Sequence, residues 1–193
     1  MIVSSARKFK IPAMAHIKNH NLSLKELYAS NHSLVHGYIK KQSGATLYKG
    51  DNMNSKKMLT SVLHTVQMGQ SGIKSVENYA IRPALKQQLQ KQRSEYDAME
   101  TAARQLAQQH NWELKDISPG ILKMSDMMAR MRLMGGERDS KIAGMLIQGN
   151  TRGMILGMKN LRKGKKADEN VQALTQRLVA QEKASIKSSQ PFL

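Results

Sequence analysis

"GMLIQGNTRGMILGM" (residues 144–158) combines side chains that suit a buried helix with residues that a buried helix usually avoids. Aliphatic and methionine side chains recur in it at helical spacing, whereas four glycines and the amides Gln148 and Asn150 interrupt them. Glycine costs a helix roughly 0.5–1 kcal/mol relative to alanine, and a buried amide needs a hydrogen-bond partner. The stretch therefore predicts a helix whose glycine and amide positions face other helices inside a bundle.

Composition favours helices and excludes several kinds of site. The chain has 193 residues, enough for one hydrophobic core, with 4% aromatic residues and 14 methionines. It has no cysteine, so disulfides, thiolate metal sites and cysteine nucleophiles are excluded. No apolar run approaches the roughly 18 residues that cross a bilayer, and no secretory signal is visible. We therefore expect a cytoplasmic protein without a membrane partner, although the net charge of +17 is also typical of proteins that bind nucleic acid or an anionic surface.

Residues 1–52 differ from the rest of the chain. They hold eight Lys/Arg, two Asp/Glu and four of the six histidines, without a sustained apolar period. Lys49-Gly50-Asp51 can be encoded by a purine-rich ribosome-binding sequence a few bases before the codon for Met53. We therefore expect residues 1–52 to be a translated leader, with a disordered basic tail as the alternative. Residues 53–193 alone carry 23 basic and 12 acidic side chains, a net charge of +11.

From residue 55 onward, apolar residues recur at intervals of three and four, the period of amphipathic helices. Asn54 or Ser55, Pro83 and Asp168 are typical of helix starts, and Gly135-Gly136 interrupts the chain. We expect helices over residues 55–80, 83–110, 119–134, 138–162 and 169–188. The second of these carries a heptad seam, formed by Leu85, Leu89, Gln92, Tyr96, Met99, Ala103 and Leu106.

The lengths of the connections predict the topology. Short connections follow the first and fourth helices, so each should form an antiparallel hairpin with its successor. The connection over 111–137 is about 27 residues long and contains a helix of its own. Two hairpins joined by one long helical crossover are the ferritin-like arrangement of a four-helix bundle. We therefore predict an all-α, ferritin-like bundle over residues 53–193.

Aligning the two hairpins predicts a layer of amides at the centre of the bundle. "MGQSG" (68–72) matches "QGNTRG" (148–153), and "QRSEY" (92–96) matches "QEKAS" (181–185). The two members of each hairpin lie at equal distances from its turn, so each pair should share one level. The predicted core layer consists of Gln70, Gln92, Asn150 and Gln181. Amides that hydrogen-bond one another across the core would satisfy this layer, and flanking positions in contact with water are the alternative.

The same positions hold the metal ligands in di-iron carboxylate bundles, which use single glutamates and Glu-x-x-His pairs. Neutral amides do not supply the negative charge that stabilises iron or manganese, and no histidine falls on either motif. We therefore expect no catalytic residues, no metal and no cofactor. The alternative is weak residual metal binding by the two carboxylates nearest the layer, Glu95 and Glu182.

Two further patterns concern packing. Gly149, Gly153 and Gly157 form a bare ridge that lets a neighbouring helix approach closely. Five methionines recur by three and four through the crossover: Met124, Met127, Met128, Met131 and Met134. We favour packing of this crossover helix against the bundle core. A Cu(I)-binding thioether cluster and an adaptable groove for a partner helix are the alternatives.

Basic residues gather after the fourth helix, and catalytic motifs are weak. The basic residues are Lys159, Arg162, Lys163, Lys165 and Lys166. They could bind phosphate, but favourable charge at a helix C-terminus and a solvated turn are the simpler interpretation. No aromatic residue accompanies them, so base stacking is not expected. His64 and His110 stand alone on their helices, and no phosphate loop or dinucleotide motif occurs.

From about Met58 to Leu193 the chain resembles bacterial ferritin-like proteins that are related in pattern to ferritin-like spore-coat proteins. The matching segments are "VQMGQSGI" (66–73), "LKQQLQKQRSEY" (85–96), "SPG…MMARM" (118–131), "GMLIQGNTRGMI" (144–155) and "PFL" (191–193). The resemblance implies a helical bundle that can hold a di-metal centre. The four amides depart from that pattern. The resemblance implies no known activity.

These observations predict a non-catalytic structural or interaction module that has lost its di-metal site. We expect it to self-associate through its methionine-rich face or to bind a protein partner. A basic protein associated with nucleic acid is the second hypothesis, and a residual iron or manganese protein that uses Glu95 and Glu182 is the third.

Overall fold

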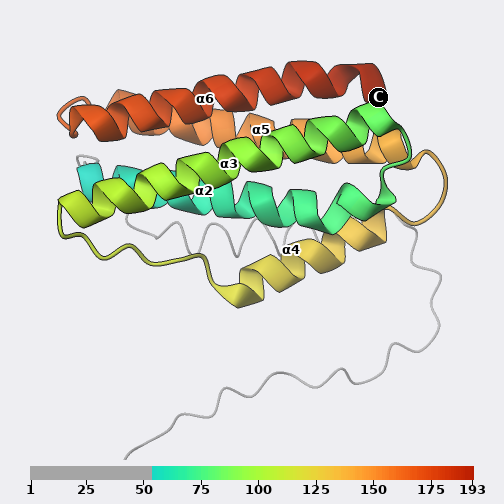
Figure 1. Cartoon of the computed structure of the whole chain (residues 1–193), viewed down its shortest axis with the longest axis horizontal. Helices are drawn as coiled ribbons and strands as arrows, with labels where there is room; N and C mark the ends of the chain where they lie inside the picture. The colour runs from blue at the N-terminus through green and yellow to red at the C-terminus, as the bar shows by residue number, and fades with distance from the viewer. Residues whose placement is uncertain (1–53) are drawn as a thin grey trace, which may run out of the picture. The chain divides into compact units, whose positions relative to one another are not determined.

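The computed structural model describes residues 54–193, which form a bundle of long helices (Figure 1). The chain divides into two units between Asp51 and Asn52, and the described residues belong to the second. The predicted leader, residues 1–52, lies outside the described residues. Within residues 54–193 no strand is present and no helix is long and apolar enough to span a membrane.

The all-helical prediction is confirmed. The α-helices are α2 (Ser55–Val76), α3 (Pro83–Gln109), α4 (Pro119–Arg132), α5 (Arg138–Lys163) and α6 (Glu169–Ser189). Short 3-10 turns, Glu77–Tyr79 and Gln190–Phe192, follow α2 and α6. The first predicted helix is therefore shorter than expected, because its last residues belong to such a turn.

Helix starts follow the capping chemistry of the sequence. The side chain of Asn54 accepts a hydrogen bond of 2.8 Å from the backbone N–H of Lys57. Asp168 caps α6 in the same way, because its Oδ1 accepts from the N–H groups of Asn170 and Val171. Pro83 and Pro119 stand in the first turns of α3 and α4, where a missing N–H costs nothing.

The bundle consists of two antiparallel hairpins, α2–α3 and α5–α6 (Figure 1). The start of α2 lies beside the start of α6, because Ser55 Oγ accepts a hydrogen bond from Asp168 N at 2.8 Å. The start of α3 lies beside that of α5, because Asp139 accepts from the N–H groups of Ile81 and Arg82. Helix α4 therefore belongs to a connection that runs the length of the bundle, and it packs along the outside of α2 (Figure 1).

The core fills the space between α2, α3, α5 and α6, each of which buries one stripe of side chains. Helix α4 contributes no buried residue. The side chains that define the centre of the core are almost all aliphatic. Polar exceptions lie on α3, α5 and α6, and four of them form the candidate site: Gln92, Tyr96, Asn150 and Glu182.

Candidate functional site

Four polar side chains meet at the centre of the bundle, and each is almost fully buried. They are Gln92 and Tyr96 on α3, Asn150 on α5 and Glu182 on α6, with exposed fractions of 3%, 1%, 4% and 1%. The amide Nε2 of Gln92 donates to Asn150 Oδ1 and to Tyr96 Oη, both at 2.9 Å. Tyr96 Oη lies 3.1 Å from both Asn150 Oδ1 and Glu182 Oε2. We call these four residues the polar centre.

Counting protons indicates that Glu182 is neutral. The phenol of Tyr96 has one proton, and it faces two oxygen acceptors at 3.1 Å. A protonated Glu182 can donate to Tyr96 Oη, and Tyr96 can then donate to Asn150. Burial raises the pKa of Glu182 from its ordinary value of 4.5 to about 8, although the bond to Tyr96 opposes the shift. The pKa of Tyr96 is also raised, by burial first and by Glu182 second.

Two atoms of the polar centre have no hydrogen-bond partner, namely Gln92 Oε1 and Asn150 Nδ2. One is an acceptor and the other a donor. An unsatisfied buried group of this kind costs about 1–3 kcal/mol. The polar centre is therefore a more costly way to fill a core than aliphatic side chains would be. What it does provide is directional bonding that fixes α3, α5 and α6 against one another.

Glycines make room for the two largest members of the polar centre. A Cβ on Gly69 of α2 would overlap the ring of Tyr96. A Cβ on Gly153 of α5 would lie 2.6 Å from Glu182 Oε1, and one on Gly157 would lie 2.5 Å from a methyl of Val179. Gly149, the third residue of the predicted ridge, is exposed and meets nothing within 4 Å. Close packing therefore applies to Gly153 and Gly157, and the prediction is wrong for Gly149.

Half of the predicted amide layer lies elsewhere. Gln92 and Asn150 lie in the polar centre and bond each other, as expected. Gln70 is half-buried and donates to Asp97 at 2.7 Å. Gln181 is half-buried, and its Nε2 donates to Ser185 Oγ at 3.4 Å. The inward positions belong instead to the residues next to them, Gly69 and Glu182.

The spacing of the stripes could have revealed this. On α6 the buried residues are Val171, Leu174, Thr175, Leu178, Glu182, Ser185 and Ser189. A step of four from Leu178 reaches Glu182, whereas the alignment of the two hairpins placed Gln181 at the inward position. Tyr96 was assigned to the α3 seam, but its hydroxyl was not recognised as part of the layer. Its position four residues after Gln92 was the available signal.

The two carboxylates proposed for residual metal binding do not meet. Glu182 lies in the polar centre, whereas the Glu95 side chain is 37% exposed and pairs with Arg177 at 3.2 Å. Among residues 54–193 no group of three or more His, Asp or Glu side chains could hold a metal ion. The polar centre offers one buried carboxyl group, two neutral amides and a phenol. This donor set does not fit a di-iron or di-manganese centre, which needs several carboxylates.

The prediction that the crossover methionines pack in the core is wrong for three of them. Met127, Met131 and Met134 are 58%, 46% and 75% exposed, whereas Met124 and Met128 are half-buried. The reason is geometric. Helix α4 lies against α2 on the outside of the bundle, so only one side of it is covered. We call Met127, Met131 and Met134 the methionine face.

The five basic residues of the predicted anion patch are all exposed, at the end of α5 and in the turn that follows. The Ser55–Asp168 bond brings the first turn of α2 to the same end of the bundle. An aromatic pair is also present there, contrary to the sequence analysis. His110 stacks on Trp112 with ring centroids 4.2 Å apart, and its Nε2 lies 3.6 Å from Asp168 Oδ2.

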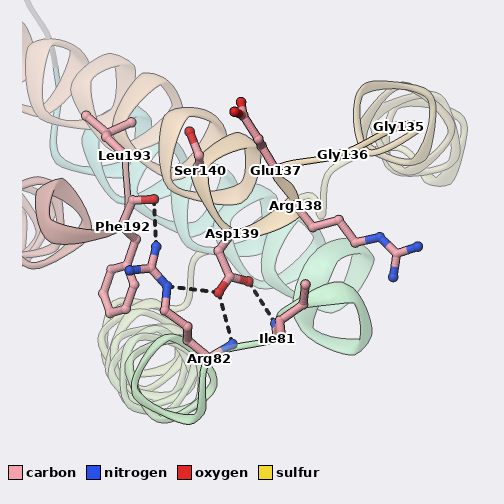
Figure 2. Close-up of a pocket in the computed structure, with 10 residues that line it drawn as sticks. All are labelled: Ile81, Arg82, Gly135, Gly136, Glu137, Arg138, Asp139, Ser140, Phe192 and Leu193. Carbon is pink, nitrogen blue, oxygen red and sulfur yellow. Dashed lines mark hydrogen bonds and ion pairs between the residues drawn. The ribbon is translucent and has the colours of Figure 1, made fainter.

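A clasp of polar bonds closes the opposite end of the bundle, where a shallow pocket opens (Figure 2). The carboxylate of Asp139 accepts from Ile81 N at 2.7 Å, Arg82 N at 2.9 Å and Arg82 Nε at 3.0 Å. The Arg82 guanidinium donates to Phe192 O at 3.0 Å and lies 4.7 Å from the centre of the Phe192 ring. These donors and acceptors bind one another, so we assign the clasp a structural role.

Comparisons of this chain with family models, curated proteins and solved structures found no match.

Proposed function

We propose that this chain is a ferritin-like bundle without a metal centre, which acts as a non-catalytic structural or interaction module and self-associates through the methionine face. The observation that carries the proposal is the exposure of the methionine face, which lies on α4, a helix that has no buried residue, and just after it. The polar centre supports the absence of a metal centre, because its one carboxyl group, two amides and phenol do not fit a site for two metal ions.

The ferritin-like assignment is supported by the direction of the helices. The bond between Ser55 and Asp168 joins the start of α2 to the start of α6, so these two helices run parallel. The bond between Ile81 and Asp139 likewise joins the start of α3 to the start of α5, so these two also run parallel. Such a bundle needs one long connection between α3 and α5, and that connection contains α4 (Figure 1). This is the ferritin-like connectivity, with one crossover between two hairpins.

The methionine face fits a second copy of itself better than a charged partner. A symmetric dimer contact places the same patch on both chains, so the patch must be self-complementary. Flexible thioether side chains adapt to one another, whereas a basic face would repel its copy. Two of the charges beside the methionine face are engaged within the chain: Arg130 pairs with Asp126 at 3.0 Å, and Arg132 donates to Gln148 at 2.9 Å.

Sedimentation velocity of the purified full chain tests the self-association. We expect a concentration-dependent dimer, and we expect Met127→Gln/Met131→Gln/Met134→Gln to sediment as a monomer with unchanged helicity. Ile155→Gln is the control, because Ile155 is 41% exposed on the outer side of α5 and its substitution should leave the dimer intact. A wild-type chain that remains monomeric at every concentration contradicts the proposal.

Elemental analysis of protein purified from its native cell tests the absence of the metal centre. We expect less than one equivalent of iron or manganese per chain. Two metal ions per chain that are lost on Glu182→Gln would show that the polar centre binds metal, and would contradict the proposal.

A further inference from the structure

The outer face of α5 combines basic and apolar side chains, and neither kind is used by the fold. The buried side of this helix carries Asn150, Gly153, Gly157 and Asn160. At a period of 3.6 residues, the side turned away from them carries seven exposed residues. They are Arg152, Ile155, Leu156, Met158, Lys159, Arg162 and Lys163, which we call the cationic face.

Along α5 no acidic residue follows Asp139, which lies in the first turn. Between Asp139 and Asp168 the chain has seven Lys/Arg and no Asp/Glu. Asp168 itself is engaged, because its Oδ1 caps α6. The cationic face continues into the exposed turn that holds Lys165 and Lys166, and the first turn of α2 adds Lys56 at the same end. A surface of this charge attracts a dense array of phosphates.

The apolar members of the cationic face decide between two kinds of phosphate surface. Ile155, Leu156 and Met158 are 41%, 44% and 45% exposed. Aliphatic side chains gain little against a nucleic-acid backbone, which is bound by cations and by free aromatic faces. His110 and Trp112 do not provide such a platform, because they stack on each other and Trp112 also packs against the core.

An anionic lipid surface fits both kinds of side chain. Helices that bind in the plane of a membrane interface place lysine and arginine at the phosphate groups and insert aliphatic side chains between them. We propose that the cationic face of α5 binds the surface of membranes that contain anionic phospholipids. This contact is peripheral and needs no spanning helix, and it departs from the expectation that the protein has no membrane partner.

Co-sedimentation of the full chain with phosphatidylcholine vesicles, with and without one-third phosphatidylglycerol, tests the proposal. We expect binding only to the anionic vesicles, and release at high salt. Lys159→Glu/Arg162→Glu should weaken the binding at least about tenfold, because each basic residue near the surface contributes independently. The matched control is Lys86→Glu/Lys91→Glu on the exposed side of α3, which makes the same charge change and should leave most of the binding.

A second pair of variants separates lipid insertion from charge alone. Ile155→Ser/Met158→Ser keeps every charge and should weaken vesicle binding several-fold, whereas Ile81→Ser/Leu193→Ser, at two other exposed apolar positions, should not. Titration of the same proteins into a labelled single-stranded oligonucleotide measures whether the cationic face binds nucleic acid instead. Thermal unfolding checks that each variant folds.

The outcomes are distinguishable. Anionic vesicle binding that falls in both cationic-face variants and in neither control supports the proposal. The proposal is overturned if anionic vesicles are not bound at low salt, or if the charge variant binds them as well as the wild type. It is also overturned if Lys159→Glu/Arg162→Glu weakens vesicle binding but Ile155→Ser/Met158→Ser does not. A third contradicting result is a chain that binds the oligonucleotide through Lys159 and Arg162 and does not bind vesicles.

Discussion

The ring of Tyr96 lies against Gly69, at a point where any side chain on α2 would overlap it. The glycine thus lets Tyr96, the largest buried side chain among residues 54–193, reach Asn150 and Glu182 from α3. This pair explains why the layer contains no amide from α2. The inward position of that helix is kept empty, and Gln70 beside it turns to Asp97.

The first prediction is that Gly69→Ala destabilises the fold by at least about 2 kcal/mol, because the added methyl group meets a rigid ring rather than a flexible chain end. The matched control is Gly72→Ala on the same helix, where an added Cβ meets nothing within 4 Å. Alanine should stabilise that position by a few tenths of a kcal/mol or more. Urea unfolding measures both, and equal effects of the two substitutions would refute the account of Gly69.

The second prediction concerns the bond between Gln92 and Asn150. Gln92→Leu or Asn150→Leu alone leaves a buried polar partner and should cost about 1–3 kcal/mol. The double variant removes both and should cost at least about 1 kcal/mol less than the sum of the single variants. Gln70→Leu is the control, since Gln70 is half-buried and lies outside the polar centre. If the free-energy losses of the two single variants add up to the loss of the double variant, the two amides do not interact.

Sequence reasoning located the helices well because their signals are local. The start at Pro83, the cap at Asp168 and the seam of α3 depend on residues a few positions apart. The structure confirms the start, the cap and the seam from Leu85 to Ala103, whereas the last buried position is Ala107 and not the predicted Leu106. The polar centre depends on contacts between residues as far apart as Tyr96 and Glu182, 86 positions along the chain. A shift of one residue in the stripe decides which of Gln181 and Glu182 faces inward, and pairing the hairpins by residue type favoured the amide.

The methionine face illustrates a different limit. The spacing of Met127 and Met131 correctly predicts one side of α4, whereas Met134 follows the end of the helix. Spacing alone does not say whether that side meets the core or solvent. The outcome depends on how α4 lies against α2, which is set by the length of the crossover and by packing between distant segments.

The third prediction concerns the pH dependence of stability. The folded chain holds the pKa of Glu182 at about 8, above the ordinary value of 4.5, so the native state keeps a proton that the unfolded state releases. Its stabilising effect is complete below pH 4.5 and is lost as pH rises toward 8, by about 1.4 kcal/mol per pH unit. Glu182→Gln keeps the shape and has nothing to ionise.

We therefore expect the unfolding free energy of Glu182→Gln to be close to that of the wild type at pH 5 and greater by about 4 kcal/mol at pH 9. Chemical unfolding monitored by circular dichroism across this range measures both chains. Parallel pH profiles would contradict the assignment of a neutral Glu182. The exposed Glu113→Gln is the control and should leave the profile of the wild type unchanged.

The fourth prediction concerns the clasp. Asp139→Ala leaves three donors, Ile81 N, Arg82 N and Arg82 Nε, without their acceptor and should cost about 2 kcal/mol (Figure 2). Hydrogen bonds from these donors outweigh burial and hold the pKa of Asp139 below its ordinary value, so the contribution is present at neutral pH and is lost in acid. Glu95→Ala, which removes a surface pair with Arg177, should have no measurable effect on thermal unfolding.

The most direct test of the central claim is a carbon NMR titration of the glutamate side-chain carboxyl groups, with Glu182→Gln used to assign one resonance. If the bundle is closed at its centre by a protonated Glu182, that resonance will titrate near pH 8. A Glu182 signal that ionises between pH 4 and 5, or one that broadens and shifts on addition of one equivalent of manganese, would contradict the claim.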